Sequence, residues 1–237
     1  MCTVSWWRRE GALSLRFNRD EQRGRAVASP PCINEQPLIW PKDPQGGGTW
    51  ICLDRWGTVH CVLNHYDAEM VALPPNPESR GALPLLSAKN PERAVSDWLT
   101  PGPYPPFHLF RIPLQGETSH VTWDGQHLEL RPVHTDLTLW TTSGWNAHEV
   151  IVSRASLFDR MINEHGLSED TLTAFHYAFD AENPGRWPRM SRGDARTVSY
   201  SEIRVTEKEM TFEYTAFEGI EPGPATSCKQ VCLPLKK

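Results

Sequence analysis

The sequence lacks a long apolar segment and a surplus of positive charge. No run approaches the roughly 18 apolar residues that a membrane-spanning helix needs, and the N-terminal residues lack the apolar core of a secretory signal. The net charge is −5, so there is no basic field that would neutralise nucleic-acid phosphates. We therefore expect a cytoplasmic protein that neither spans a membrane nor binds nucleic acid.

Motifs that bind metals, phosphates or covalent haem are also missing. The six cysteines form no C-x-x-C pair, and Cys228-x-x-x-Cys232 has no second ligand pair beside it. Gly46-Gly47-Gly48 precedes an expected strand and lacks the Lys-Ser/Thr ending of a phosphate-binding loop. No C-x-x-C-H motif would attach haem covalently. We predict that the protein holds no metal and no covalently bound cofactor.

Proline and tryptophan, in contrast, are abundant. The chain has 21 prolines and 10 tryptophans among 237 residues, which indicates a loop-rich protein with aromatic surfaces or clefts. The hydrophobic fraction of 39% is enough for a packed core. We expect a single domain over residues 1–237.

Period-2 alternation predicts strands early and late in the chain. Leu13, Leu15 and Phe17 alternate with Ser14 and Arg16, the pattern of a half-buried strand. Asp54-Arg55-Trp56-Gly57 and Asp124-Gly125 are typical of hairpin turns. The predicted strands are 2–7, 12–18, 49–53, 58–63, 107–112, 118–123, 127–133, 137–142, 197–205 and 210–217.

Helical patterns lie mainly between these two groups of strands. An apolar stripe over 147–165 follows Asn146 and Glu149, which have capping-box spacing, and Gly166 is expected to end the helix. A second helix is predicted at 169–179, after Ser168, and a short one at 91–99. Strands followed by helices and then strands again favour an α+β sandwich over alternating βαβ units.

Cys2 combines two reactive groups on one residue if Met1 is removed. The free α-amine has a reference pKa of about 7.7–8.0 and so is partly neutral at pH 7. The thiolate is the nucleophilic form of a cysteine whose reference pKa is about 8.5. A nucleophile and its base on one residue is the arrangement of N-terminal-nucleophile enzymes. The alternative is that cysteine at this position is incidental.

Five segments favour a catalytic Cys2 over an incidental one, because they resemble the NRDE family, also called the transport and Golgi organisation type 2 family. These are MCTVSWW, FNRDE (17–21), GGGTW (46–50), LNHYD (63–67) and MSRGDARTVSYSEIRV (190–205), which together span nearly the whole chain. The resemblance implies the four-layer αββα sandwich of the N-terminal-nucleophile hydrolases, in agreement with the α+β order above.

The resemblance also implies an active site around Cys2. Asn18, Arg19 and Asp20 would line it, with Arg19 holding Cys2 as a thiolate or binding a substrate carboxylate. Asp20 would orient the α-amine or Arg19. The alternative is a charged turn whose aspartate caps backbone amides.

An oxyanion hole is implied less completely. Cysteine amidases that look like this fold place an asparagine where Asn64 stands, and a donor there stabilises developing negative charge; an ordinary strand-ending asparagine is the alternative. Ser143 occupies the position where such amidases offer another asparagine. The predicted substrate-binding residues are Glu21, Trp50 and Ser143.

Two functions follow from the resemblance. One is a hydrolase of amide or thioester bonds in small acylated substrates, with Cys2 as nucleophile. The other is a non-catalytic protein that binds haem or a lipid-like ligand reversibly, because family members are implicated in haem trafficking. His60, His65 and His134 are then candidate iron ligands, although for each one alone an ordinary core or surface role is the favoured alternative. An inert descendant of the fold is a third possibility.

Overall fold

The computed structural model describes residues 1–33, 38–66, 75–91, 93–100, 102–217 and 225–235. The chain divides into two compact units, and each unit combines segments that are far apart in the sequence. The first unit comprises Met1–Arg25, Asp136–Arg204 and Thr211–Gln230, and the second comprises Ala26–Thr135, Val205–Met210 and Val231–Lys237. Each unit is built on its own antiparallel sheet.

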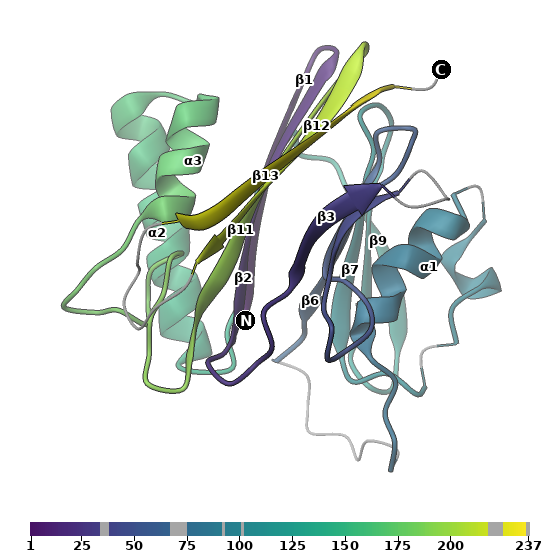
Figure 1. Ribbon diagram of the computed structural model, residues 1–237, viewed down its shortest axis with the longest axis horizontal. Helices are drawn as coiled ribbons and strands as arrows, with labels where there is room; N and C mark the ends of the chain where they lie inside the picture. Colours follow the sequence, from purple (N-terminus) through teal and green to yellow (C-terminus); the bar gives the residue numbers. More distant parts are fainter. Residues whose placement is uncertain (34–37, 67–74, 92, 101, 218–224, 236–237) are drawn as a thin grey trace. The chain divides into compact units, whose positions relative to one another are not determined.

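The first unit contains a six-stranded sheet in the order β10-β1-β2-β11-β12-β13 (Figure 1). The chain's first hairpin, β1–β2, therefore lies inside this sheet and not at its edge. The strands are β1 (Cys2–Arg9), β2 (Ala12–Gln22), β10 (Leu137–Thr142), β11 (Ala195–Thr206), β12 (Glu209–Phe217) and β13 (Ala225–Pro234).

Two helices, α2 (Ala147–His165) and α3 (Glu169–Tyr177), cover one face of this sheet (Figure 1). Leu157 and Phe158 of α2 meet Leu172 and Phe175 of α3 in one buried cluster. Trp7, Leu137 and Leu139 from the sheet pack against the same cluster. Both helices thus pack together on the sheet that holds β1 and β2.

The second unit contains a seven-stranded sheet in the order β3-β4-β5-β6-β7-β8-β9. A short helix, α1 (Leu83–Lys89), packs on β5, β6 and β7. Two 3₁₀ turns, Arg80–Ala82 and Val95–Asp97, flank it. The strands are β3 (Ser29–Ile33), β4 (Ile39–Lys42), β5 (Ile51–Leu53), β6 (Val59–Asn64), β7 (Phe107–Ile112), β8 (Thr118–Trp123) and β9 (Leu128–Val133).

The turn signals behave as their chemistry predicts. Asp54 Oδ1 accepts the backbone N–H groups of Trp56 and Thr58, both at 2.9 Å, and Gly57 takes φ +80°. Asp124 Oδ1 likewise accepts two backbone N–H groups in the β8–β9 turn. Aspartates that satisfy turn amides and a glycine with positive φ explain why both hairpins form where they were expected.

The structure confirms two of the predicted helix ends and contradicts one. Gly166 ends α2 with φ +78° and donates its N–H to Ile162 O, and Ser168 Oγ accepts the Thr171 N–H at the start of α3. The capping box at Asn146 is wrong: this residue has φ +42° and its side chain caps no amide. Its amide instead donates to Glu149 Oε2 at 3.4 Å, because a capping side chain requires extended backbone at the cap.

Other elements were shifted or missed. The helix predicted at 91–99 is only the 3₁₀ turn Val95–Asp97 among the described residues, and the one predicted at 169–179 ends at Tyr177. Helix α1 is absent from the sequence-based prediction, although a proline in the first turn is compatible with a helix start. Strands β3, β4 and β13 were also missed.

Gly48 allows the closest backbone approach in the second unit. A Cβ at Gly48 would lie 2.2 Å from the carbonyl oxygen of Gly81, and this same oxygen accepts the Thr49 N–H at 2.8 Å. We expect Gly48→Ala to lower the free energy of unfolding by about 2 kcal/mol, because backbone and not a flexible side chain must move. Urea unfolding measures this. Gly102→Ala, which meets no atom within 4 Å, is the control; equal effects of the two substitutions would contradict the explanation.

Candidate active site

Cys2 begins β1, between Arg19 of β2 and Thr142 of β10. The antiparallel ladders place Cys2 directly opposite both residues. Side chains of directly opposed residues project from the same face of a sheet, so Cys2, Arg19 and Thr142 share a face. The next residue, Thr3, projects from the other face, where its hydroxyl bonds to Arg154 of α2. Cys2 therefore lies on the face away from the helices and is half-buried.

The pKa of the Cys2 thiol lies above its ordinary value. Burial raises its pKa, and the nearby Asp20 carboxylate adds to the rise. The chain-terminal amine, the Asp20 backbone N–H and Arg19 lower the pKa without reversing the direction. Arg19 favours the thiolate by lowering this pKa, and its role in holding Cys2 as a thiolate stays a prediction.

Asp20 is a buried carboxylate that lies beside the N-terminus. Its backbone N–H donates to Met1 O at 3.1 Å. Its Oδ1 accepts the Thr197 hydroxyl at 2.7 Å, and its Oδ2 lies 3.6 Å from Arg154 Nη2 with no hydrogen bond to a described residue. Burial raises the pKa of Asp20, while Arg154 and the terminal amine oppose the rise. One carboxylate oxygen is thus available for a cation in addition to Arg154.

Arg154 neutralises Asp20 from inside the sheet–helix interface. It is fully buried on α2 and donates to Thr3 Oγ1 at 2.6 Å, to Thr141 Oγ1 at 3.0 Å and to the carbonyls of Arg186 and Trp187. Sequence reasoning missed this residue. The signal was present, because an arginine interrupts the apolar stripe of α2 at a position that faces the core.

Asn18 serves the packing of α3 more than the thiol. Its Nδ2 donates to the carbonyls of His176 and Pro188, both at 2.8 Å. With both amide hydrogens used, Oδ1 accepts from His176 Nδ1 at 3.2 Å, and His176 Nε2 then accepts the Ser5 hydroxyl at 2.9 Å. The structure therefore places Asn18 on the helix-covered face, opposite Thr3, and not on the face that carries Cys2.

Arg19 and Glu21 form a pair beside Cys2. Arg19 Nη2 lies 3.3 Å from Glu21 Oε2, and Arg25 Nε lies 3.4 Å from the same oxygen. Arg19 is buried, whereas Glu21 keeps a quarter of its side chain exposed. Arg19 thus lies opposite Cys2 on the ladder and shares the Glu21 carboxylate with Arg25.

Met1 covers the end of β10. Its sulfur lies 2.8 Å from Ser143 Oγ and 3.9 Å from Arg192 Nη1. Arg192 also stacks on the Trp145 ring at 5.1 Å and forms a two-pronged ion pair with Asp194. Sequence reasoning did not single out Arg192, although it stands in the quoted 190–205 segment. Removal of Met1 would expose a surface formed by these residues next to Cys2.

Two predicted site residues belong to the second unit. Asn64 ends β6, and its Nδ2 donates to Tyr66 Oη at 2.6 Å. Trp50 is only 6% exposed, so its indole belongs to the core of that unit. The oxyanion role of Asn64 and the substrate-binding role of Trp50 stay predictions.

The sequence profile of the Transport and Golgi organisation 2 family matches residues 1–216. The chain belongs to this family. No curated protein sequence matches it significantly. The family assignment confirms the resemblance that the NRDE motif indicates.

Solved structures show the fold of this family member. A variant of the conjugated bile acid hydrolase from Clostridium perfringens superimposes with a TM-score of 0.57 at 10% identity, over 100% of this chain and 97% of that one. Penicillin V acylase from Agrobacterium tumefaciens gives 0.50 at 12% identity, over 91% and 83%. The Caenorhabditis elegans ortholog of N-acylethanolamine-hydrolyzing acid amidase gives 0.50 at 9% identity, over 86% and 92%. The fold is the α+β fold of N-terminal-nucleophile hydrolases.

His60, one candidate haem ligand in this family member, is fully buried. Its Nδ1 lies 2.8 Å from Ser87 Oγ and its Nε2 lies 3.2 Å from Asp54 Oδ2. Both ring nitrogens are thus occupied, and burial lowers the pKa of His60. The group ties α1 to β6 and does not fit an iron ligand. His134 is an exposed residue whose Nδ1 lies 3.7 Å from Glu117.

Three further imidazoles gather in the second unit. His108 Nδ1 lies 3.1 Å from His120 Nε2, and the His65 ring centre is 4.2 Å from that of His108. Burial lowers the pKa of His108 to about 3 and that of His120 to about 4. Among the described residues, no group of three or more His, Cys, Asp or Glu side chains is arranged to hold a metal ion.

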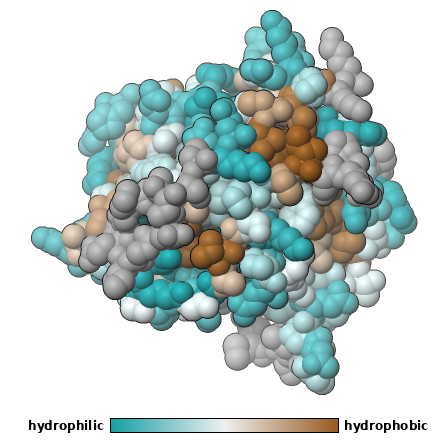
Figure 2. Space-filling model, in the orientation of Figure 1, coloured by the Kyte–Doolittle hydropathy of each residue, from teal (hydrophilic) through white to brown (hydrophobic). Residues whose placement is uncertain are grey.

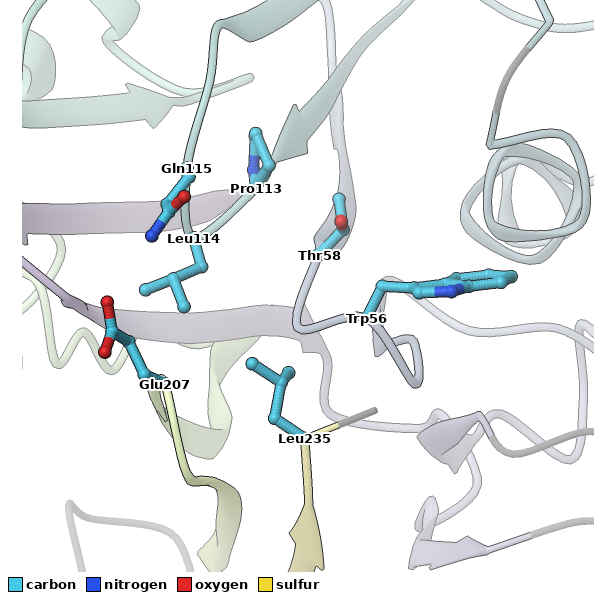
Figure 3. Close-up of a pocket in the computed structure, with 7 residues that line it drawn as sticks. All are labelled: Trp56, Thr58, Pro113, Leu114, Gln115, Glu207 and Leu235. Carbon is cyan, nitrogen blue, oxygen red and sulfur yellow. The ribbon is translucent and has the colours of Figure 1, made fainter. Parts of the chain in front are cut away.

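A surface pocket of about 500 Å³ opens elsewhere in the second unit (Figure 3). None of the predicted site residues lines it. The pocket is lined by Trp56, Thr58, Pro113, Leu114, Gln115, Glu207 and Leu235.

On the face seen in Figure 2, apolar residues form separate patches among polar ones. No helix within the described ranges is long and apolar enough to cross a membrane.

The Asp20–Arg154 pair makes Arg154 a strong determinant of stability. We expect Arg154→Leu to lower the free energy of unfolding by about 3–5 kcal/mol, because it leaves a buried carboxylate without its cation. Urea unfolding measures the change. Arg160→Leu, an exposed position on the same helix, should change it by less than about 0.5 kcal/mol; a similar small change for Arg154→Leu would show that the buried pair is not required.

Buried neutral histidines predict a loss of stability in mild acid. The folded-state pKa values of His108 and His120 lie below the ordinary value of 6.5, so the unfolded chain binds protons more strongly than the folded one. Their contribution is complete above pH 6.5 and is lost as the pH falls towards 4. Urea midpoints between pH 7 and 4 should fall less steeply in the variant His108→Gln/His120→Gln than in the wild type. Exposed His127→Gln should keep the wild-type slope; an unchanged slope in the double variant would exclude these residues as the cause.

Proposed function

We propose that the protein is a hydrolase with an N-terminal cysteine nucleophile, acting on amide or thioester bonds of small acylated substrates. The observation that carries the proposal is the placement of Cys2 at the start of β1, with Asp20 and Arg19 beside it. The fold supports it, because its solved neighbours are named a conjugated bile acid hydrolase, a penicillin V acylase and an N-acylethanolamine-hydrolyzing acid amidase.

The proposed reaction begins when Met1 is removed and Cys2 becomes the first residue. Its neutral α-amine takes the thiol proton, and Sγ attacks the substrate carbonyl carbon to form a tetrahedral oxyanion. The protonated amine then gives its proton to the leaving amine or thiol as the bond to the carbonyl carbon breaks. Water hydrolyses the resulting thioester of Cys2 and releases the carboxylic acid with the thiol restored.

The raised pKa of the thiol fits this use of the amine. A protonated nucleophile needs a base within reach, and the α-amine of the same residue is partly neutral near pH 7. Asp20 would orient that amine through Oδ2, the oxygen that makes no hydrogen bond to a described residue. Arg154 would act as a positioning residue, since it fixes Asp20 and lies 3.6 Å from the same oxygen.

The competing proposal is a carrier of haem or a lipid-like ligand with no turnover. His60 is fully buried, so the candidate haem ligands are His65, His134 and Cys2. Haem titration followed at the Soret band separates the two proposals. Saturable haem binding by a protein that hydrolyses no acylated substrate would favour the carrier. Cytoplasmic location remains a sequence-based prediction under both.

Two experiments on the N-terminus test the enzyme proposal: the state of Met1 and the effect of replacing Cys2. Intact-mass measurement should show that Met1 is absent from the purified protein. Cys2→Ala should then abolish hydrolysis of a panel of small acyl-amides and acyl-thioesters, because no thiol remains to form the acyl intermediate, and Cys2→Ser should be slower than the wild type.

Cys32→Ala, which removes an exposed thiol, is the matched control and should keep wild-type turnover. Unfolding curves would establish that the Cys2 variants are folded. A retained Met1, or equal turnover by wild type and Cys2→Ala, would overturn the proposal.

A further inference from the structure

Three consecutive hydroxyl residues end β10 and enter the segment before α2. The Thr141 hydroxyl bonds to Thr3 Oγ1 at 2.8 Å and receives Arg154 Nη1 at 3.0 Å. Ser143 Oγ bonds to the backbone of Trp145 and contacts the sulfur of Met1. Thr142 differs from both neighbours: its Oγ1 is buried and makes no hydrogen bond to any described residue.

A buried hydroxyl without a partner costs free energy and needs a reason. Position supplies one. Thr142 is the β10 residue directly opposite Cys2, so the two Cβ atoms lie about 4.5–5.5 Å apart on one face of the sheet. Met1 covers the adjacent residue, Ser143, in this state. Loss of Met1 would therefore uncover the end of the β1–β10 ladder, where the hydroxyl and the thiol lie side by side.

We propose that Thr142 is a catalytic residue, whose hydroxyl donates a hydrogen bond to the oxyanion formed when Cys2 attacks a carbonyl. This inference rests on the proposed function. The donor role suits a group with no competing acceptor, since its hydrogen is uncommitted before the oxyanion forms. It also gives this chain an oxyanion donor in the first unit, on the same ladder as the nucleophile, where Ser143 is already engaged by backbone atoms.

The test compares two reactions of Cys2, one with an oxyanion and one without. Acetylation by p-nitrophenyl acetate passes through a tetrahedral oxyanion, whereas alkylation by iodoacetamide displaces iodide and forms none. Modification of Cys2 in the Met1-free protein is followed by peptide mass spectrometry. Thr142→Val, which has nearly the same shape, should slow acetylation on the order of 100-fold and leave alkylation unchanged.

Two variants complete the experiment. Thr142→Ser keeps a hydroxyl and should retain most of the acetylation rate. Thr138→Val makes the same substitution on the same strand and face, about 13 Å away, and should have no effect on either reaction. A fall in both reactions of Thr142→Val by the same factor would indicate a structural role and overturn the inference.

The failure of this inference differs from the failure of the proposed function. If wild-type Cys2 is acetylated and Thr142→Val is acetylated equally fast, Thr142 is not an oxyanion donor, and the enzyme proposal stands. If Cys2 is alkylated but never acetylated in the wild type, both the enzyme proposal and the role of Thr142 are overturned.

Discussion

The buried guanidinium of Arg154 is the contact on which the first unit depends. It reaches from α2 into the sheet and bonds to β1 through Thr3, to β10 through Thr141 and to β2 through Asp20. Two backbone carbonyls of the segment after α3 accept its remaining donors. A charge withdrawn from water is tolerated only when it is paired and its donors are satisfied. One side chain thus fixes three strands and a helix around the chain's first residues.

The two faces of the β1–β2 hairpin have different chemistry. On the helix-covered face, Ser5, Asn18 and His176 form a closed chain of hydrogen bonds that uses every donor they offer. The opposite face carries Val4 and Phe17, which are buried, and then Cys2 at its end. The thiol therefore lies on the face opposite these polar contacts.

The second unit also contains a buried chain of polar side chains. Asp54 satisfies a turn with one carboxylate oxygen and His60 with the other, and His60 passes the contact on to Ser87 of α1. Three such residues in a row match the residue types of a hydrolytic triad. All three are almost completely buried, so the arrangement anchors a helix to its sheet.

The sequence by itself determined ten of the strands, the hairpin turns, the helices α2 and α3 and the identity of the first-unit candidates, because these depend on alternation, on turn aspartates and on a motif of adjacent residues. It did not determine short elements such as α1 and β3, whose propensities are outweighed by tertiary packing. Only the tertiary structure decided which face each residue occupies: adjacent residues in a strand point to opposite sides, so Asn18 serves a helix and Arg19 the thiol. It also showed what Arg154 and Thr142 meet, since Arg154 contacts Thr3 and Asp20, and Thr142 lies opposite Cys2, across more than 100 positions of the chain.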